Sequence, residues 1–428
     1  MDQYAQKLRA FDTAPVIDQL TRLYGTRKGQ LLLQRNRYAA ALSRHEKAFH
    51  ASAPVSLISA PGRTEIGGNH TDHNRGLVLA AAVNLDTLAA VSPREDLIVN
   101  LRSEGYPPLR VDLSDLAPQP REKGTTAGII RGVAARMQAL GYTIGGFDAA
   151  AGSTVASGSG LSSSAAFEVL VSAIFDALYN GFRMDYVTRA KVGQYAENEY
   201  FGKPSGLLDQ MASAAGGLVT VDFRNENPQV RPLGYDFAAK GYALVVVGTG
   251  GSHADLTADY AAIPAEMKAV AACFGAKVLR EVRPEEFAAA LPDLRGKVSD
   301  RALLRAIHFY GENERVIRQV SALERDDLPA FLEEIIASGR SSFMYLQNVW
   351  AKPQEQSLSL ALAMAERMLA GRGAWRVHGG GFAGTTLNFV PADLLPSFVS
   401  EMERAFGPRS CHVLDIRPVG ACVLRTEG

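Results

Sequence analysis

The sequence has 428 residues, enough for two domains of ~100–200 residues each. Lys plus Arg and Asp plus Glu both number 45, so the chain has no basic excess with which to bind a nucleic-acid backbone or an anionic membrane. Hydrophobic residues make up 47% and charged residues 21% of the chain, as in folded globular domains. The composition excludes a disordered chain and argues against nucleic acid as a partner.

The cysteines and the apolar runs indicate the cellular compartment in which we expect the protein. Cys273, Cys411 and Cys422 are odd in number and show no CxxC spacing, which excludes a disulfide framework and a zinc ribbon. The N-terminal residues lack the apolar core of a leader, and the longest apolar runs, at 77–83 and 243–247, are far shorter than the ~20 residues that span a bilayer. We therefore expect a cytoplasmic protein with no membrane partner.

The first half of the chain predicts helices and strands in mixed order. Helical spacing of apolar residues predicts two amphipathic helices within the first fifty residues. Apolar runs separated by Gly, Asn and Pro then predict strands at 55–60, 77–83, 87–92 and 97–101. A helix over 126–140 ends at Gly141, and the elements that follow are a long helix after residue 162, helices at 187–201 and 207–215, and a strand at 218–223.

A polar, Pro-containing loop at 224–232 is the candidate domain boundary. Beyond it the patterns predict a strand at 243–247, a helix at 258–274, several helices between 300 and 369, strands at 375–377 and 386–390, a helix at 394–406, and strands at 413–417 and 421–424. Strands and helices are mixed in both halves, so we predict an α+β protein with domains at 1–230 and 231–428.

A run of small residues opens the long helix of the first half. Such a run leaves backbone N–H groups uncovered where the helix dipole is positive, and serine hydroxyls add donors or ligands for a hard cation. A linker or a serine-rich helix cap is the plainer alternative, but the strongly amphipathic helix that follows favours a phosphate-binding loop. Its residues are Gly158, Ser159, Gly160, Leu161, Ser162, Ser163, Ser164 and Ala165.

Two other glycine-rich segments are weaker signals. The segment 379–384 formally matches GxGxxG, but the residues after it predict a strand, whereas a dinucleotide-binding turn must open a helix. A tight structural turn is the better interpretation. The segment 248–252 ends a strand and is typical of a loop.

Twelve polar or glycine residues gather between two apolar strands at 61–74, more than a turn requires. A metal site from His70, Asp72 and His73 and a pocket for a polyhydroxylated substrate both fit these residue types. Alternate residues of an extended loop share a side, so His70 and Asp72 converge, and the hydroxyl-binding pocket is favoured. Asp209 lies in the first turn of a predicted helix, where it is either a helix cap or an ionised functional carboxylate.

Together these segments resemble the GHMP kinases and, within them, the galactokinases. The segment 61–74 is similar to the galactokinase signature PGRxNxIGEHTDYN, and 158–165 to the phosphate loop GSGLSSSA. The segment 206–210 resembles GxMDQ, and 376–384 resembles the third motif, RMTGGGFGG. Four matches in the same order are specific.

The resemblance implies a two-domain GHMP kinase fold with a mixed sheet and helices in each domain and the active site in the cleft between them. It implies transfer of the γ-phosphoryl group of ATP to the anomeric hydroxyl of galactose, with Mg²⁺ as cofactor. The partner is then a small sugar, and we expect a monomer. A kinase for another hexose, a pentose or an acidic sugar, and a regulator that senses ATP and galactose without turnover, are the alternatives; a metallohydrolase around His70 is a third.

The resemblance also assigns roles to residues by position. Asp209 is the candidate base, and Arg63 orients it and stabilises developing negative charge. Ser164 and Glu197 match the Mg²⁺ ligands. The residues that match sugar-binding positions are Asn69, His70, Asp72, Gly206 and Tyr260.

Two departures from the family pattern stand out. Asn69 replaces the glutamate of GEHTDY, so a neutral amide stands where the family has a charged acceptor for a sugar hydroxyl, and this exchange predicts an altered sugar preference. The region ahead of the third motif is rewritten as 345–353.

Overall fold

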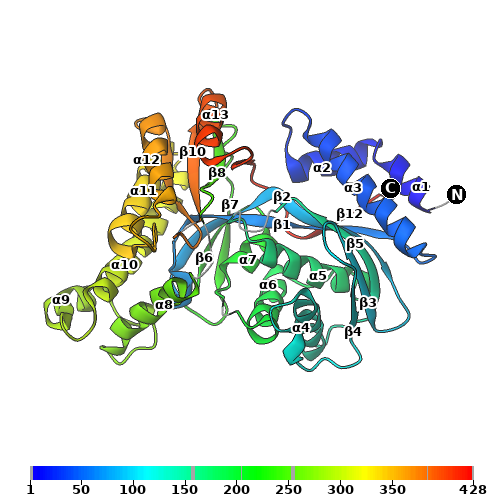
Figure 1. Cartoon of the computed structure of the whole chain (residues 1–428), viewed down its shortest axis with the longest axis horizontal. Coiled ribbons are helices and arrows are strands. Elements are labelled where there is room, and N and C mark those ends of the chain that lie inside the picture. Colours follow the sequence, from blue (N-terminus) through cyan, green and yellow to red (C-terminus); the bar gives the residue numbers. More distant parts are fainter. Residues whose placement is uncertain (1–2, 156–159, 204, 252–255, 383, 427–428) are drawn as a thin grey trace.

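The computed structural model describes residues 3–155, 160–203, 205–251, 256–382 and 384–426. Two β-sheets form its framework, and helices cover their faces (Figure 1). The first sheet has eight strands in the order β12-β1-β2-β5-β3-β4, with β6 pairing with β2 and β7 with β6. The second sheet has four strands in the order β11-β8-β10-β9. The α+β class predicted from the sequence is confirmed.

The bounds of the strands are β1 Ser56–Gly67, β2 Leu77–Pro93, β3 Ile98–Ser103, β4 Leu109–Asp112, β5 Phe147–Ser153, β6 Leu218–Asp222, β7 Gln229–Leu233, β8 Tyr242–Gly248, β9 Ala374–His378, β10 Thr385–Pro391, β11 Cys411–Leu414 and β12 Cys422–Leu424. The α-helices are α1 Gln3–Ala10, α2 Ala14–Tyr24, α3 Gln30–Phe49, α4 Thr126–Ala139, α5 Ser163–Tyr179, α6 Tyr186–Tyr195, α7 Leu208–Ala215, α8 Thr257–Ala272, α9 Pro284–Leu294, α10 Asp300–Glu324, α11 Leu328–Ser341, α12 Ser357–Leu369 and α13 Leu395–Phe406. The short helical turns are η1 Asp72–Asn74, η2 Pro120–Glu122, η3 Ala196–Phe201, η4 Leu279–Glu281 and η5 Ser342–Leu346.

The two faces of the first sheet bury different helices. Helices α4 to α7 pack on one face, and α1 to α3 cover part of the other (Figure 1). Alternation along β2 accounts for the division, because successive side chains of a strand point to opposite faces. Val78 and Ala80 enter the core under α4 to α7, whereas Leu79 and Ala81 enter the core shared with the second sheet.

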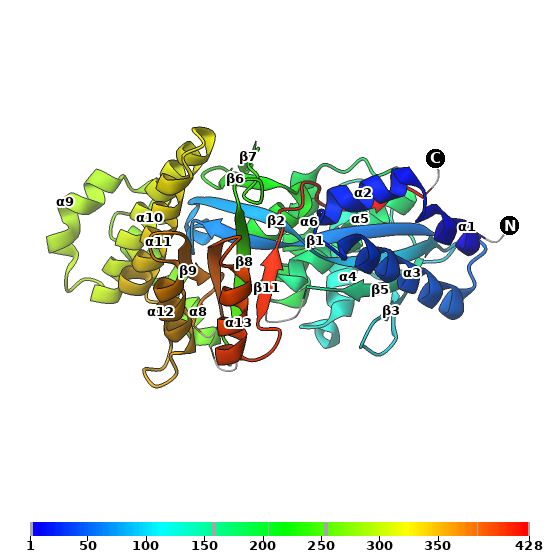
Figure 2. The same cartoon turned by 90° about the horizontal axis from the view of Figure 1, so that it is seen from above.

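The second sheet is buried on both faces, as the continuous apolar run of β8 indicates. Leu244 and Val246 pack toward α11, whereas Val245 and Val247 pack toward α12 and α13. Figure 2, the view from above, shows α10 to α12 on the left of this sheet and α1 to α3 on the right side of the molecule. The polar motif at the end of β1 contacts β9 and the glycine turn after it, so the two sheets meet at this motif.

Two strands differ from the sequence expectation. The strands predicted at 77–83 and 87–92 are a single strand, β2, and β1 continues through the polar motif as far as Gly67. The polar residues in the middle of β2 have distant partners: Asn84 exchanges hydrogen bonds with Asp415, and Asp86 binds Arg417 at 3.0 Å. These partners let a polar segment stay in a buried strand.

The start of the chain also differs from prediction. Three helices, rather than two, fill the first fifty residues.

The predicted boundary between residues 230 and 231 falls inside β7, which still pairs with the first sheet. After the second sheet, the chain returns to the first sheet, where β12 pairs with β1. The first sheet is therefore built from both ends of the sequence.

Candidate active site

Arg63 and Asp209 form the central contact of the candidate site. Arg63 lies on β1 and Asp209 in the first turn of α7, and two parallel hydrogen bonds join them: Nε to Oδ1 at 2.6 Å and Nη2 to Oδ2 at 2.8 Å. Arg63 is 7% exposed, whereas about a third of the Asp209 side chain, 35%, remains accessible. No side chain caps α7, and the Asp209 carboxylate binds Arg63 instead, so the helix-cap interpretation of Asp209 is wrong.

The same arginine binds the phosphate loop. The backbone N–H of Arg63 donates to the Leu161 carbonyl at 3.0 Å, and its Nη1 donates to the Gly160 carbonyl. The hydroxyl of Ser162 donates to Oδ2 of Asp209 at 2.7 Å. Arg63 thus fixes the backbone of the loop and the carboxylate of α7 in one arrangement.

The charge on Asp209 follows from these contacts. Burial opposes ionisation, but the positive charge of Arg63 and the hydrogen bonds from Arg63 and Ser162 outweigh it and hold the pKa of Asp209 below its usual value. A carboxylate has about four lone-pair positions, of which these donors use three. One position on Oδ1 is left for a further donor.

The sugar motif continues as a tight turn after β1. Asp72 begins η1, and its carboxylate lies against the Cα of Gly206, where a Cβ at position 206 would overlap Oδ2 of Asp72. Burial, together with the negative charges of Asp209 and Glu65, raises the pKa of Asp72 to about 6, although His70 counteracts them. Asp72, Gly206 and Asp209 are therefore brought together, as the sequence predicts.

His70 connects this turn to the third glycine motif. Its φ is +55°, a left-handed conformation that is costly for a residue with a side chain, and its Nε2 lies 3.0 Å from the Gly380 carbonyl. Because a carbonyl only accepts, Nε2 carries the proton, and Nδ1 of the neutral ring is an acceptor. Burial keeps the pKa of His70 below its usual value, which favours the neutral ring.

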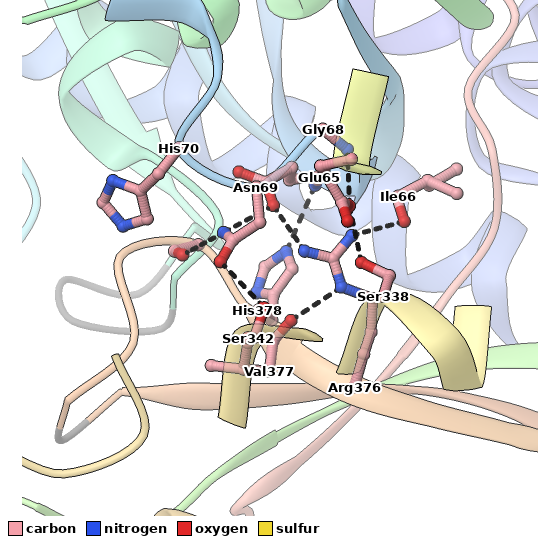
Figure 3. Close-up of polar contacts among 12 residues, drawn as sticks. Glu65, Ile66, Gly68, Asn69, His70, Ser338, Ser342, Arg376, Val377 and His378 are labelled. Carbon is pink, nitrogen blue, oxygen red and sulfur yellow. Dashed lines mark hydrogen bonds and ion pairs between the residues drawn. The ribbon is translucent and has the colours of Figure 1, made fainter. Parts of the chain in front are cut away.

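Asn69 lies in a polar network with Glu65 and Ser342, whereas the His70 ring lies apart from that network (Figure 3). The Asn69 side chain is fully buried, with Nδ2 donating to Glu65 at 2.8 Å and to the Gly379 carbonyl at 2.7 Å. Its Oδ1 accepts from Asn348 Nδ2 at 2.9 Å and from Ser342 at 3.4 Å. Protein partners thus occupy all its hydrogen-bonding positions, and the expectation that Asn69 contacts the sugar does not agree with this placement.

Arg376 neutralises the buried carboxylate in this network. Its Nη2 binds Oε1 of Glu65 at 2.7 Å, Nη1 donates to the Ile66 carbonyl at 2.5 Å, and Nε donates to the Val377 carbonyl at 2.9 Å (Figure 3). Arg376 is completely buried on β9. A strand of the second sheet therefore holds β1 of the first sheet directly behind the sugar motif.

The third glycine motif is a turn between β9 and β10, as the sequence predicts. The ring of Tyr260, from α8, lies so close to Gly380 that a Cβ there would be 2.5 Å from the ring, and its hydroxyl donates to the Gly381 carbonyl at 3.1 Å. Tyr260 also packs edge-on against Phe382, with ring centroids 5.2 Å apart. Tyr260 is thereby brought to the turn that His70 contacts.

The structure describes only some of the residues that the sequence predicts to bind phosphate and metal. Gly158 and Ser159 lie outside the described residues, whereas Ser163 and Ser164 occupy the first turn of α5, with Ser164 exposed. Ala165 and Leu161 are buried.

Glu197 lies on η3 and is 3% exposed, with Oε1 3.1 Å from Lys203 Nζ and Oε2 accepting from Gln210 at 2.9 Å. The same amide of Gln210 donates to Oε2 of Glu168 at 2.9 Å. The other oxygen of Glu168 is buried without a partner among the described residues, and burial and the charge of Glu197 raise the pKa of Glu168 well above its usual value.

Within the described residues, no three His, Cys, Asp or Glu side chains gather as a metal site. His73 instead binds Asn74 through Nδ1 at 2.9 Å, and its ring lies 5.7 Å from that of His70. The geometry thus offers no support for the metallohydrolase alternative.

Comparison with known proteins agrees with this arrangement. The family model described as the galactokinase galactose-binding signature matches residues 43–93, and the GHMP kinases N terminal domain matches residues 128–217. A galactokinase of Streptomyces coelicolor is 33% identical over 377 residues, which cover 86% of this chain and 93% of that protein. The chain belongs to the galactokinase family.

Solved structures of the galactokinase family and its GHMP relatives share the fold. The crystal structure of Lactococcus lactis galactokinase complexed with galactose matches with a TM-score of 0.78 and 26% identity, covering 89% of this chain and 98% of that one. Mevalonate kinase of Methanococcus jannaschii matches with a TM-score of 0.60 at 14% identity over 86% of this chain and 99% of that chain, which shows the fold alone. The two-domain GHMP kinase fold predicted from the sequence is confirmed.

Sequence patterns missed several residues of this galactokinase-family site. Arg376 had a signal, since a charged residue in an apolar strand requires a buried partner. Asn348, Lys203 and Glu168 had none, because their roles depend on contacts between distant elements. Along the described part of the chain, no helix is both long and apolar enough to cross a membrane.

Proposed function

We propose that the chain is an ATP-dependent galactose kinase that transfers the γ-phosphoryl group of ATP to the anomeric hydroxyl of galactose. The observation that carries this proposal is the contact of Arg63 with Asp209, Gly160 and Leu161, which brings a carboxylate for the sugar hydroxyl and the phosphate loop to one arginine. The membership in the galactokinase family and the likeness to a galactose-bound relative support the choice of sugar.

Asp209 receives the hydroxyl proton in the proposed reaction. The free position on Oδ1 accepts a hydrogen bond from the anomeric hydroxyl and orients its oxygen toward the γ-phosphorus. The new O–P bond forms as the bond from the γ-phosphorus to the bridging oxygen breaks, ADP departs, and the proton moves to Asp209. Because the pKa of Asp209 is low, the proton moves only once the O–P bond is forming, as a loose transition state permits.

Arg63 stays cationic throughout. Its guanidinium holds Asp209 in place and offsets negative charge that builds up between the sugar oxygen and the phosphoryl group. The N-terminus of α5 and the backbone of the loop before it bind the phosphates in this proposal, with Ser163 and Ser164 as donors. Ser162 serves Asp209 rather than the phosphates.

The oxygen donors present suit Mg²⁺, which prefers carboxylate and hydroxyl ligands. Ser164 and Glu197 would hold it, and Mg²⁺ when bound neutralises charge on the ATP phosphates. Lys203, whose side chain is 62% exposed, is free to leave Glu197 when a cation arrives. The unpartnered buried oxygen of Glu168, which Gln210 links to Glu197, adds an oxygen donor that fits a cation in this group.

In the proposed sugar site, Asp72 and Nδ1 of His70 accept hydrogen bonds from ring hydroxyls, and Gly206 allows the sugar to approach the backbone. Tyr260 lines the side of the proposed sugar site that is next to the third glycine motif. A kinase for another sugar is not favoured, because Asn69, the residue that suggested it, lies in a buried network. A sensor without turnover is not favoured either, since Arg63, Ser164, Glu197 and Asp209 are all retained. A monomer in the cytoplasm remains our expectation.

A coupled ADP-release assay with Mg²⁺-ATP tests the proposal. Galactose is compared with other hexoses, pentoses and uronic acids at equal concentration, and ³¹P NMR of the product identifies the phosphorylated oxygen. We expect turnover on galactose with phosphate on the anomeric oxygen. Turnover on a different sugar alone, or binding of galactose and ATP without ADP release, would overturn the proposal.

A further inference from the structure

A cavity of about 370 Å³ lies beside the third glycine motif. Its volume lies within the range of small-molecule sites. The walls come from α8, α10, η5, the segment after η5 and the glycine turn, and they include Asp259, Arg301, Arg305, Gln347, Trp350 and Phe382. Phe382 belongs to the third glycine motif, and the others have no role in the site described above.

The cavity adjoins the proposed sugar site. Its wall residue Phe382 packs edge-on against Tyr260, and Tyr260 covers Gly380, whose carbonyl binds His70. Phe382, Tyr260 and the Gly380 carbonyl therefore connect the cavity wall to His70 through a short series of contacts.

Arg305 provides an unused donor at the cavity wall. It is 1% exposed, with Nε donating to the Leu346 carbonyl at 3.1 Å and Nη1 to Glu266 at 2.9 Å. Its Nη2 makes no hydrogen bond to any described residue. This nitrogen belongs to a side chain that lines the cavity, so it is placed to donate to an acceptor on a ligand there.

The charges at the cavity wall and directly behind it balance. Arg301 and Arg305 line the cavity and both bind Glu266, which does not line it, and Asp259 adds a second carboxylate at the wall. This balance gives no preference for a phosphate or another anion. It gives a ligand with several hydroxyl groups both donors and acceptors, from Arg305, Gln347 and Asp259.

Two aromatic side chains also line the cavity. Trp350 is 37% exposed and Phe343 is 46% exposed, so both present ring surface at the cavity. Flat apolar rings beside donors and acceptors suit the face of a pyranose, which combines C–H groups with hydroxyls. We propose that this cavity is a saccharide subsite that binds a hexopyranose ring next to the galactose site.

This inference rests on the proposed function in that galactose occupies the neighbouring site. The ring has two possible sources: a second residue attached to the galactose away from its anomeric carbon, or a separate sugar that acts as an effector. Both sources present the same kind of pyranose ring to the cavity. The experiment uses tryptophan fluorescence, because the sequence contains only Trp350 and Trp375, and Trp375 is 9% exposed.

The wild-type protein is titrated in two experiments. In the first, methyl β-galactoside, which has no free anomeric hydroxyl, is added in the presence of saturating galactose. In the second, a disaccharide that has galactose at its reducing end is added alone. A fluorescence change that is lost in Trp350→Phe, where Trp375 is the only tryptophan, supports the subsite. In ADP release, a disaccharide kcat/KM about tenfold above that of galactose assigns the ring to the substrate, and a response to methyl β-galactoside assigns it to an effector.

Trp350→Ala and Gln347→Ala are expected to reduce the preference for the disaccharide, or the effector response, about tenfold. Met344→Ala is the matched control, since Met344 is 58% exposed on the same segment and does not line the cavity. The inference fails if neither sugar changes the fluorescence of Trp350 and if both cavity variants keep the wild-type ratio of kcat/KM. Fluorescence needs no turnover, so a failure of the kinase proposal alone would leave the binding signal in place.

Discussion

Arg63 binds Asp209 through two parallel hydrogen bonds while its own backbone N–H binds the phosphate loop at Leu161. The two charged residues are 146 positions apart in the sequence. One arginine thereby sets the distance between the Asp209 carboxylate and the backbone of the loop at Leu161. In the proposed function these two groups serve the sugar and the phosphates.

Arg63→Lys keeps the charge but loses the planar pair of donors, because an ammonium group cannot bind both carboxylate oxygens in the same way. We predict that kcat falls about 100-fold, a typical loss for a group that stabilises the transition state. The KM for galactose is expected to change less than kcat. Steady-state kinetics measure both values, and a variant with wild-type kcat would show that the bidentate contact is not needed.

Gly206→Ala tests the close approach of Asp72. The added methyl group would overlap the Asp72 carboxylate, so Asp72 must move away from the sugar. We predict a KM for galactose about tenfold higher and an unchanged KM for ATP. Gly234→Ala is the matched control, since a Cβ at Gly234 meets no atom within 4 Å. Equal effects of the two variants would contradict the placement of Asp72 in the sugar site.

Asp72 also predicts the pH dependence of sugar binding. Its pKa is raised to about 6, so it is ionised above this pH and loses its acceptor capacity as the pH falls through this value. We expect kcat/KM for galactose to fall about tenfold per pH unit below pH 6. The pKa of Asp209 is lowered, so Asp209 stays ionised over this range and is not the origin of the decline.

Asp72→Asn is the test of this assignment. The variant is expected to bind galactose more weakly at pH 7 and to show no decline in kcat/KM between pH 7 and 5. An unchanged decline in the variant would assign the titration to another group.

Asn69→Glu is predicted to destabilise the protein rather than to change its sugar preference. The new carboxylate would lie next to Glu65 in a fully buried network, and an uncompensated buried charge costs about 3–5 kcal/mol. The family signature has Asn at the position of Glu65 and Glu at the position of Asn69. We therefore expect the double variant Glu65→Asn and Asn69→Glu to regain part of the lost stability.

Thermal unfolding and the sugar panel together examine this prediction. A stable Asn69→Glu variant with a new sugar preference would mean that position 69 faces the substrate.

Local patterns were sufficient for much of the fold. The helix after the phosphate loop, α5, and the turn at Gly379 and Gly381 follow from residue types within a short window. The unbroken strand β2 does not, because the partners of Asn84 and Asp86 include Asp415 and Arg417, which are more than 300 positions away.

Local patterns were also insufficient to predict the contacts within the candidate site. The resemblance to the family assigned Arg63 and Asp209 their roles, but not the contacts of Arg63 with the phosphate loop. The direction of Asn69 depends on Asn348 and Gly379, which belong to other elements. No spacing rule could place these side chains behind the sugar motif, and the motif match therefore gave an expectation for Asn69 with which its observed contacts do not agree.

The most direct test of the account is the turnover of Asp209→Asn with galactose, measured with the dissociation constant of ATP for the same variant. Asp96→Asn, which removes a surface partner of Arg94, is the matched control. We predict that kcat of Asp209→Asn falls by about 10³-fold, because the proton acceptor is lost, while ATP binds as in the wild type. Turnover close to that of the wild type would contradict the role of Asp209 and the reaction built on it.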